Sequence, residues 1–354
     1  MELTAELLLD APSGAPPRVR RLSGAPGPDW TAAVAAHHLA LAPEWHRTIR
    51  EAYGHEPLYL AAEAGERRAV LPAFAIRRPL LGPAVTSMPF LDAGGPAGAP
   101  ELTAPLLAQL ALEAQRAGAR LLEVRATRPL PLPAEPSLAK VTLALSLPGD
   151  PDRLWRGLDA KVRNQIRKAE RSGVSVEAQA GAGLLPAFYE VFARNMRDLG
   201  SPVHDPGFLR AVLAAFGDRA RVLLARRAGQ AVGGLITLVH GDTLYTPWAS
   251  SLRAEARHCP NMLLYWEALA GACRDGFRRF DFGRSTRGAG TYRFKRQWGA
   301  EELPLYWYVL PLRDGAAPPR GESRGLRLAG GIWRRLPLGL TRRRGPRLRR
   351  LLTQ

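Results

Sequence analysis

The chain has 354 residues, 46% of them hydrophobic, and a formal net charge of +18. This length predicts about two domains, and the lack of an 18-residue apolar run excludes a transmembrane helix. Twelve arginines between Arg313 and Gln354 place a net +10 in the C-terminal tail, so the scattered arginines elsewhere indicate a solvated surface rather than a nucleic-acid-binding face.

The N-terminus and the cysteines indicate the compartment. Glu2 and Glu6 stand where a signal peptide would carry positive charge. Cys259 and Cys273 match no metal-binding spacing and are typical of reduced thiols. The seven histidines also form no ligand spacing, so no metal site is expected. We expect a cytoplasmic protein.

The first part of the chain predicts helices followed by an antiparallel meander. A helix-like stretch with aromatic residues covers 30–54, and alternation around Gly65 predicts two strands within 57–76. A long helical pattern follows at 102–119 and leads to a strand at 120–126.

The second part repeats this order of elements. A helix is predicted at 184–200 and three strands with turns at Gly229 and Gly241 within 221–251. A helix at 261–276 then leads to a strand at 278–285. The repeated order predicts a duplicated α+β domain.

Proline and glycine mark the expected boundaries. The Pro-rich stretch and strand at 130–151 place the first boundary near 148. The Gly- and Pro-rich segment after Leu312 is typical of a linker. The expected domains are therefore 1–147 and 148–312, with a basic linker and tail at 313–354.

A basic helix is predicted at 153–171. Its apolar residues, from Trp155 to Ala169, recur at three- and four-residue steps. Arg163 and Arg167 lie one turn apart on the remaining face and suit bidentate contacts with phosphate. A solvated basic face and a phosphate-binding face remain open here.

The stretch 280–299, "FDFGRSTRGAGTYRFKRQWG", predicts a strand, a Gly-rich loop and a short helix. Gly288 and Gly290 permit a close backbone approach to a ligand, and a helix start with Lys295 one turn in favours an anion. Neither the Walker A spacing nor the dinucleotide fingerprint is present, which disfavours ATPase and dehydrogenase functions.

This stretch and its continuation to Tyr308 resemble the C-terminal signature of FemAB-like proteins of the GNAT acyltransferase superfamily, in the subgroup associated with exosortase/PEP-CTERM systems. The stretches 87–98, 154–176, 192–203 and 332–352 are similar in the same order. The resemblance implies two tandem GNAT-like domains, each a mixed, mainly antiparallel sheet flanked by helices. It also implies transfer of an acyl or aminoacyl group to an amine of an envelope or exopolysaccharide precursor.

The resemblance implies one site residue, and the local sequence suggests the others. Lys295, which with Phe294 matches a Phe-Lys pair of the family, would stabilise charge on a substrate phosphate or an oxyanion. Asp281 would orient the amine or accept its proton, or instead hold the loop in place. The expected substrate-binding residues are Arg163, Arg167, Asn195, Arg197, Arg284, Ser285, Gly288, Gly290, Tyr292 and Phe294.

The donor is left open between acyl-CoA and aminoacyl-tRNA, and no tightly bound cofactor is expected. The Gly-containing loop that binds CoA in the superfamily is replaced by "LRAEARHCPN" at 252–261, which lacks glycine. The acceptor would be a small-molecule or lipid-linked amine. A CoA-dependent N-acetyltransferase, and a non-catalytic module that binds nucleic acid or lipid, remain alternatives.

The tail at 325–352 combines apolar residues such as Ile332 and Trp333 with many arginines. Such a segment suits the surface of an anionic membrane, and a flexible basic tail is the alternative. Peripheral binding at the inner face of the membrane is the corresponding localisation.

Overall fold

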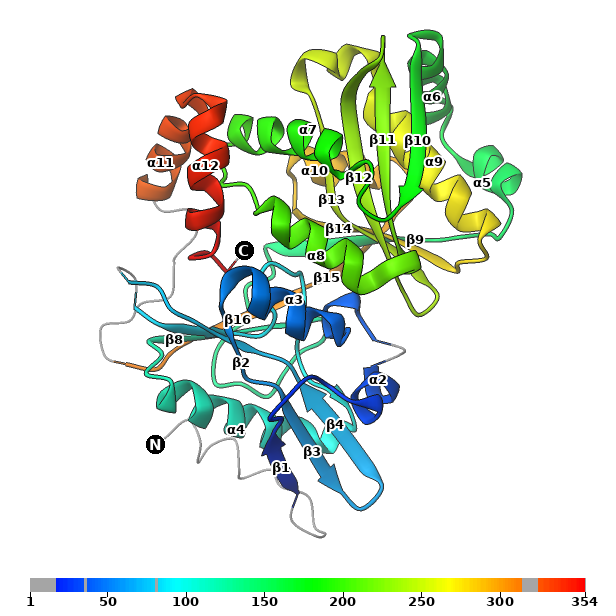
Figure 1. Cartoon of the computed structure of the whole chain (residues 1–354). Coiled ribbons are helices and arrows are strands. Elements are labelled where there is room, and N and C mark those ends of the chain that lie inside the picture. The colour runs from blue at the N-terminus through cyan, green and yellow to red at the C-terminus, as the bar shows by residue number, and fades with distance from the viewer. Residues whose placement is uncertain (1–16, 35–36, 80–81, 314–323, 354) are drawn as a thin grey trace. The chain divides into compact units, whose positions relative to one another are not determined.

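The computed structural model describes residues 17–34, 37–79, 82–313 and 324–353. It divides into two compact units. The first contains residues 1–141, 304–320 and 351–354, and the second contains residues 142–303 and 321–350. Figure 1 shows the course of the chain through both units.

The first unit contains two small sheets. One has the order β1-β3-β4-β7, with antiparallel neighbours: β1 (Arg18–Arg21), β3 (Leu60–Ala64), β4 (Arg67–Leu71) and β7 (Ala97–Gly98). The other has the order β16-β8-β6-β5-β2 and is antiparallel except for the pair β6 and β8: β16 (Tyr306–Pro311), β8 (Leu121–Ala126), β6 (Ala84–Thr86), β5 (Phe74–Ile76) and β2 (Glu56–Pro57).

Helices cover these sheets. They are α2 (Pro28–Val34), α3 (Glu44–Tyr53) and α4 (Thr103–Arg116), with short 3-10 turns at Leu39–Leu41 and Pro100–Leu102. α4 buries its leucines and alanines against β3, β4 and β8, for example Leu106, Leu110 and Ala114, all fully buried. This apolar face explains why the strongly periodic pattern of α4 forms a helix.

The second unit is built on one seven-stranded sheet with the order β10-β11-β12-β13-β14-β9-β15. From β10 to β13 the neighbours are antiparallel, and β13 and β14 are parallel. The strands are β10 (Val174–Ala180), β11 (Ala220–Arg227), β12 (Gln230–His240), β13 (Thr243–Ser251), β14 (Arg279–Thr286), β9 (Lys140–Ser146) and β15 (Glu301–Pro304).

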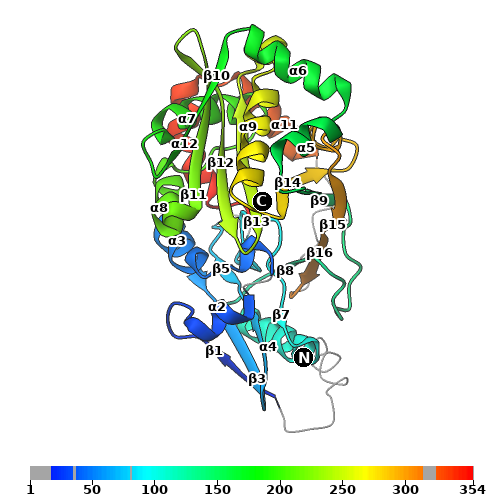
Figure 2. The ribbon, with the colours of Figure 1, turned by 90° about the vertical axis from the view of Figure 1, so that its right-hand side faces the viewer.

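Helices lie on both faces of this sheet (Figure 2). On one face are α7 (Leu185–Asp198) and α8 (Pro206–Phe216). On the other face α9 (Pro260–Arg274) crosses the central strands, with α5 (Pro151–Gly157) and α6 (Ala160–Arg171) beside it. The remaining helical elements are the 3-10 turns Gly217–Arg219 and Arg253–His258, and α10 (Gly290–Arg296), α11 (Arg324–Arg335) and α12 (Leu338–Arg349).

The observed units differ from the expected domain bounds because β16 returns to the first unit. Tyr306–Pro311 pair antiparallel with Leu121–Ala126, although 304–312 was expected in the second domain. The second unit also extends into the tail, since α11 and α12 contact α7. The part of the tail at 314–323 lies outside the described residues.

The basic helix expected at 153–171 is two helices. Leu158 leaves the helical conformation with ψ 145°, and the Asp159 side chain accepts a hydrogen bond from the Lys161 N–H at 2.7 Å. This N-cap starts α6. The apolar spacing continues across the break, so periodicity alone could not reveal it.

The segment 87–95 of the first unit is held by a buried guanidinium. Arg125, fully buried, donates to Glu123 Oε1 at 2.9 Å and to the Leu91 carbonyl at 2.7 Å, and lies 4.3 Å from the centre of the Trp307 ring. Phe90 has a φ of 71°, an uncommon conformation for an aromatic residue. The contacts of Arg125 therefore hold the main chain of the "SMPFLDAGG" stretch in place.

Among the described residues, no helix combines the length and apolar character needed to cross a membrane.

Candidate active site

The parallel strands β13 and β14 separate at one end of the second sheet. They pair only over Thr243–Tyr245 and Arg279–Asp281, whereas β13 continues to Ser251 and β14 to Thr286. Pro247 lies in the unpaired part of β13, where its missing N–H breaks no ladder with β14. Carboxyl ends of parallel strands that separate are common ligand sites, so we place the candidate site here.

A buried polar network spans the point of separation. Thr246 Oγ1 donates to the main-chain carbonyl of Asp281 at 3.0 Å and so bridges β13 and β14. The Asp281 carboxylate, 4% exposed, accepts from Thr142 Oγ1 at 2.8 Å and from the Gly283 N–H at 2.6 Å. The contacts favour the second of the two expected roles of Asp281, that of holding the loop.

An aromatic cluster supports this network from the side of α9. Tyr265 stacks on Phe282 at 5.5 Å and meets the edge of Phe294 at 5.2 Å. Burial raises the pKa of the Tyr265 phenol above its ordinary value, while its hydrogen bond with Thr246 acts in the opposite direction. Tyr265 therefore stays a neutral hydrogen-bonding group beside the opening.

Lys295 is buried, with 8% of its surface exposed. Its Nζ donates to the carbonyl oxygens of Gly283 at 2.7 Å and of Arg284 at 2.8 Å. Gly283 has a φ of 71°, a conformation that favours glycine. The ammonium thus ties α10 to the end of β14, whereas the sequence predicted a lysine that stabilises charge on a substrate phosphate or an oxyanion.

Ser285 lies on β14, two residues after Gly283. Its side chain is 4% exposed, and its Oγ has no hydrogen-bond partner within the part of the chain that the structure describes. A buried hydroxyl without a partner is costly. Ser285, one of the substrate-binding residues predicted from the sequence, therefore stays a candidate for direct contact with a bound substrate.

The Gly-rich loop is ordered by contacts of its own. Gly288 has a φ of 75°. Glu302 pairs with Arg287 at 2.6 Å and shares a hydrogen bond with Tyr292, which raises the pKa of Tyr292 and lowers that of Glu302. α10 starts at Gly290 and has only seven residues. Its helix dipole is therefore small and contributes little to the anion site expected at its N-terminus.

The two arginines of the basic helix have separate roles. Arg163 Nη1 donates to the main-chain carbonyl of Leu158 and so caps the end of α5. The guanidinium of Arg167 lies 5.4 Å from the centre of the Trp155 ring. The structure therefore does not pair them on one phosphate as the spacing suggested.

Two of the expected substrate-binding residues, Asn195 and Arg197, lie on α7. Asn195 Nδ2 donates to Ser250 Oγ at 2.9 Å, which brings α7 to the unpaired end of β13. Arg197 pairs with the adjacent Asp198 at 2.7 Å. Asn195 is thus part of the candidate site, and Arg197 is occupied by its neighbour.

The segment before α9 holds several of its main-chain N–H groups in local hydrogen bonds. It forms the 3-10 turn Arg253–His258 and then Cys259 at φ 54°. The N–H groups of Glu255, Cys259 and Met262 donate to carbonyls within this segment. These three N–H groups are therefore already bonded and are not free main-chain donors for an anion.

The sequence missed Thr142, Thr246 and Tyr265. Two signals indicate Thr246 and Tyr265 in retrospect. Pro247 stands next to Thr246 inside a predicted strand, and Tyr265 is a tyrosine within the apolar pattern of α9. Thr142 had no signal, because its partner Asp281 is distant along the chain. Among the described residues, no three His, Cys, Asp or Glu side chains gather as metal ligands.

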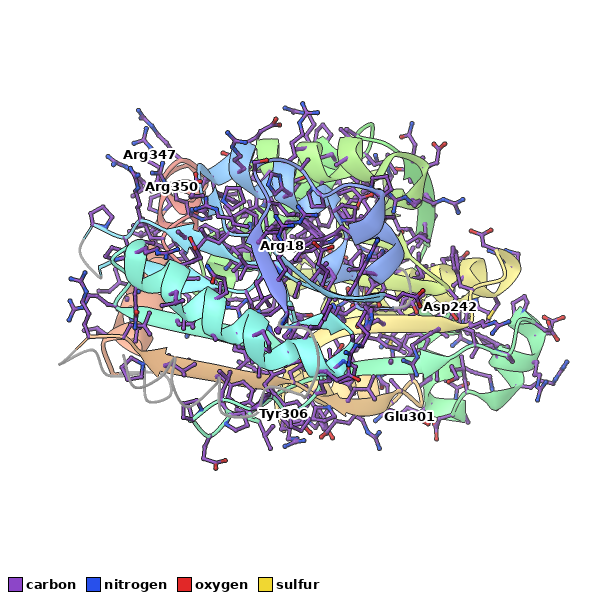
Figure 3. All side chains as sticks on the ribbon, turned by 90° about the horizontal axis from the view of Figure 1, so that it is seen from below. Arg18, Asp242, Glu301, Tyr306, Arg347 and Arg350 are labelled. Carbon is purple, nitrogen blue, oxygen red and sulfur yellow. The ribbon has the colours of Figure 1, made fainter. Side chains whose placement is uncertain are left out.

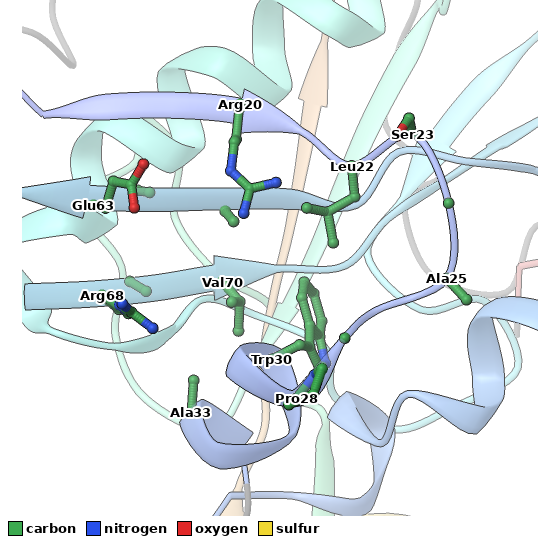
Figure 4. Close-up of a pocket in the computed structure, with 15 residues that line it drawn as sticks. Arg20, Leu22, Ser23, Ala25, Pro28, Trp30, Ala33, Glu63, Arg68 and Val70 are labelled. Carbon is green, nitrogen blue, oxygen red and sulfur yellow. The ribbon is translucent and has the colours of Figure 1, made fainter.

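The first unit has a hollow of about 350 Å³ between β1, β3, β4 and the segment that leads into α2 (Figure 4). Trp30, Leu22 and Val70 give it an apolar wall, and Arg20, Arg68 and Glu63 lie at its rim. Its mixed charges favour no single ligand, so it is not the candidate site.

Comparisons with known proteins concern the fold and the family of the second unit. Residues 157–296 match the family model described as the acetyltransferase (GNAT) domain, and this range contains β13, α9, β14 and α10. No curated protein matches the chain.

Several solved structures are similar in fold. The structure titled FemX has a TM-score of 0.62 at 13% identity, over 82% of this chain and 97% of that one. A tandem GNAT protein from the clavulanic acid biosynthesis pathway has a TM-score of 0.57 at 14% identity, over 86% and 99%. The C-terminal domain of a putative lysylphosphatidylglycerol synthetase from Agrobacterium fabrum has 0.52 at 12%, over 86% and 94%. The chain therefore has two GNAT-like domains of mixed sheets flanked by helices.

Proposed function

We propose that this protein is an N-acyltransferase that moves an acyl or aminoacyl group to an amine. The observation that carries the proposal is the separation of β13 and β14 after Tyr245 and Asp281, inside the segment that matches the GNAT domain. There, main-chain groups of two neighbouring strands are left outside the ladder. Such groups can hold an extended donor and orient its carbonyl.

The chemistry is direct attack by a neutral amine. The amine nitrogen forms a bond to the donor's carbonyl carbon, the bond from that carbon to the donor's oxygen or sulfur breaks, and the amine proton leaves with the released group. Ser285 Oγ is available to hydrogen-bond the substrate. Lys295 acts as a positioning residue, because it holds the two carbonyls that shape the end of β14.

An aminoacyl or acyl ester donor is the form of the proposal that we favour over acyl-CoA. The bonded amides before α9 support this choice, since they leave CoA without its usual main-chain cradle. The resemblance of 280–308 to the exosortase/PEP-CTERM-associated subgroup supports an amine of a cell-envelope or exopolysaccharide precursor as the acceptor. It supports a cytoplasmic site of action as well.

Mass spectrometry tests the proposal. The protein is incubated with aminoacyl-tRNAs or acyl-CoAs and a panel of amines, and the products are searched for the mass of the transferred group. Transfer from an aminoacyl-tRNA is the expected result, and transfer from acyl-CoA alone would replace our choice of donor. If neither donor class yields product, and unrelated polyanions raise the melting temperature as much as the donors do, the chain is a binding module instead.

A further inference from the structure

The C-terminal helices α11 and α12 form a hairpin that is fixed to the second unit. Arg342 pairs with Glu190 of α7 at 2.6 Å, and Arg349 Nε donates to His204 Nε2 at 3.1 Å. Gly345 is buried, and a side chain there would meet Val203. The segment is therefore a packed part of the unit and not a loose basic tail.

One face of α11 points away from this contact. A Cβ atom added to Gly200 would lie 2.7 Å from the Gly330 carbonyl oxygen and 3.0 Å from Arg334 Nε, so α11 approaches the unit with that side. Successive residues turn by about 100° around a helix. Leu328 and Ile332 thus lie on the opposite side, and their surfaces are 68% and 54% exposed.

α12 is oriented in the same way. Its buried residues are Thr341 and Gly345. Leu340, 41% exposed, lies on the other side, and Figure 3 shows Arg347 and Arg350 projecting away from the ribbon. A hollow of about 390 Å³ is lined by residues of both helices and of the turn between them: Trp333, Leu336, Leu340, Arg344, Arg347 and Leu348.

The charge of the hairpin has one sign. Residues 324–350 contain no acidic residue and ten arginines: Arg324, Arg327, Arg334, Arg335, Arg342, Arg343, Arg344, Arg347, Arg349 and Arg350. Arg342 and Arg349 hold the hairpin to the unit. Several others, including Arg335, Arg343 and Arg344, are exposed beside the leucines.

The combination of exposed leucines with arginines identifies the partner. Nucleic acid would neutralise the arginines but would offer no apolar layer to Leu328 and Ile332. A bilayer offers both, because its anionic headgroups lie directly above acyl chains. We propose that the α11–α12 hairpin docks the protein on a membrane surface that contains anionic phospholipids, with its exposed leucines and Ile332 at the acyl boundary. This goes beyond the proposed function and does not depend on it.

Vesicle flotation of the full chain tests this surface. The protein should float with phosphatidylcholine vesicles that contain phosphatidylglycerol and not with phosphatidylcholine alone. The variant Leu328→Ser/Ile332→Ser should lower the partition coefficient about tenfold or more, since it removes the apolar contacts. Arg343→Gln/Arg344→Gln/Arg347→Gln should lower it on the order of 100-fold, from about 1 kcal/mol per cation.

Two matched controls distinguish the hairpin from general charge and exposure. Leu138→Ser removes an exposed leucine of the first unit, and Lys161→Gln/Lys168→Gln/Arg171→Gln removes the same charge from exposed residues of α6. Neither should change flotation by more than about threefold.

Three outcomes would overturn the proposal. The first is a wild-type chain that does not float with anionic vesicles. The second is equal losses for the hairpin variants and the control variants. The third is a Leu328→Ser/Ile332→Ser variant that floats normally while the triple arginine variant loses binding to a short RNA duplex, which would assign the surface to nucleic acid. Circular dichroism of each variant confirms that it is folded.

Discussion

The Nζ atom of Lys295 lies 2.7 Å from the carbonyl oxygen of Gly283. The lysine belongs to α10 and the glycine to β14, so one ammonium joins the strand that ends at the candidate site to the helix that follows it. A second bond to the Arg284 carbonyl completes the clamp. Lys295 is one of only four lysines in the chain. Its burial and its two hydrogen bonds indicate that it stabilises this junction.

Replacing Lys295 tests the clamp. Lys295→Met keeps the length of the side chain but leaves two carbonyls without a donor, which should lower the free energy of unfolding by about 1–3 kcal/mol. Transfer should be lost in parallel, because the end of β14 is no longer held. Urea unfolding and a single-turnover transfer assay measure the two effects.

Lys295→Arg separates positioning from a direct role on substrate. Arginine retains the donors and the charge, so it should recover most of the stability and a measurable part of the turnover rate, with little change in KM. If Lys295→Met keeps full turnover at temperatures where it is folded, Lys295 has no part in the site.

Asp281 should act through hydrogen bonds rather than through its charge. Asp281→Asn can retain the acceptor oxygen for Thr142 and Gly283, so it should cost less than about 1 kcal/mol and keep most activity. Asp281→Leu leaves both donors unpaired and should cost about 2–4 kcal/mol. A folded Asp281→Asn variant that has lost transfer by 100-fold or more would instead make Asp281 the general base.

The backbone at Gly283 should resist substitution. Gly283 has a φ of 71°, which lies in the left-handed region. Gly283→Ala should therefore lower the free energy of unfolding by roughly 1–2 kcal/mol. Gly290→Ala is the control, because an added Cβ there meets nothing within 4 Å and no positive φ occurs. The melting temperature of Gly283→Ala should therefore fall below that of Gly290→Ala. Equal melting temperatures would show that alanine causes no strain in the turn at Gly283.

Stability should fall on mild acidification because of His204. Burial first, and then the nearby Arg349, lower the pKa of His204 well below its ordinary value. The folded state therefore holds a neutral imidazole, whose stabilising effect is complete above about pH 6.5 and is lost as the pH falls towards the lowered pKa. Between about pH 7.5 and 5.5 the unfolding free energy should drop by roughly 1 kcal/mol from this group.

The measurement for His204 is the difference between two urea titrations. The unfolding free energy of His204→Asn should depend less steeply on pH than that of the wild type, because the variant lacks the His204 imidazole. His37 and His46, whose pKa values are also lowered, remain in both proteins and account for the slope that is left. Parallel curves for wild type and variant would contradict the assignment to His204.

Much of the second unit followed from local patterns. The three strands β11, β12 and β13 and the helix α9 were predicted close to their observed bounds, because short apolar runs, glycine turns and an apolar helical stripe are properties of short segments. The predicted single helix at 153–171 was wrong, since one N-cap bond of Asp159 decided the break.

The candidate site was less accessible to sequence reasoning because distant contacts build it. The sequence singled out Lys295, but the direction of its side chain depends on the turn at Gly283. The bridge from Thr246 to Asp281 joins strands that are separated by all of α9. The pairing of β16 with β8 likewise links two segments that lie on either side of residues 142–303 in the sequence, and no local pattern encodes such a register.

Hydrogen–deuterium exchange with bound donor tests the central claim that the opening between β13 and β14 is the substrate site. The full chain is measured alone, with aminoacyl-tRNA and with acyl-CoA. Aminoacyl-tRNA should slow exchange at the amides of 246–251 and 283–286, the ends of the two strands that do not pair with each other. Slowed exchange confined to other segments, or none with either donor, would contradict it.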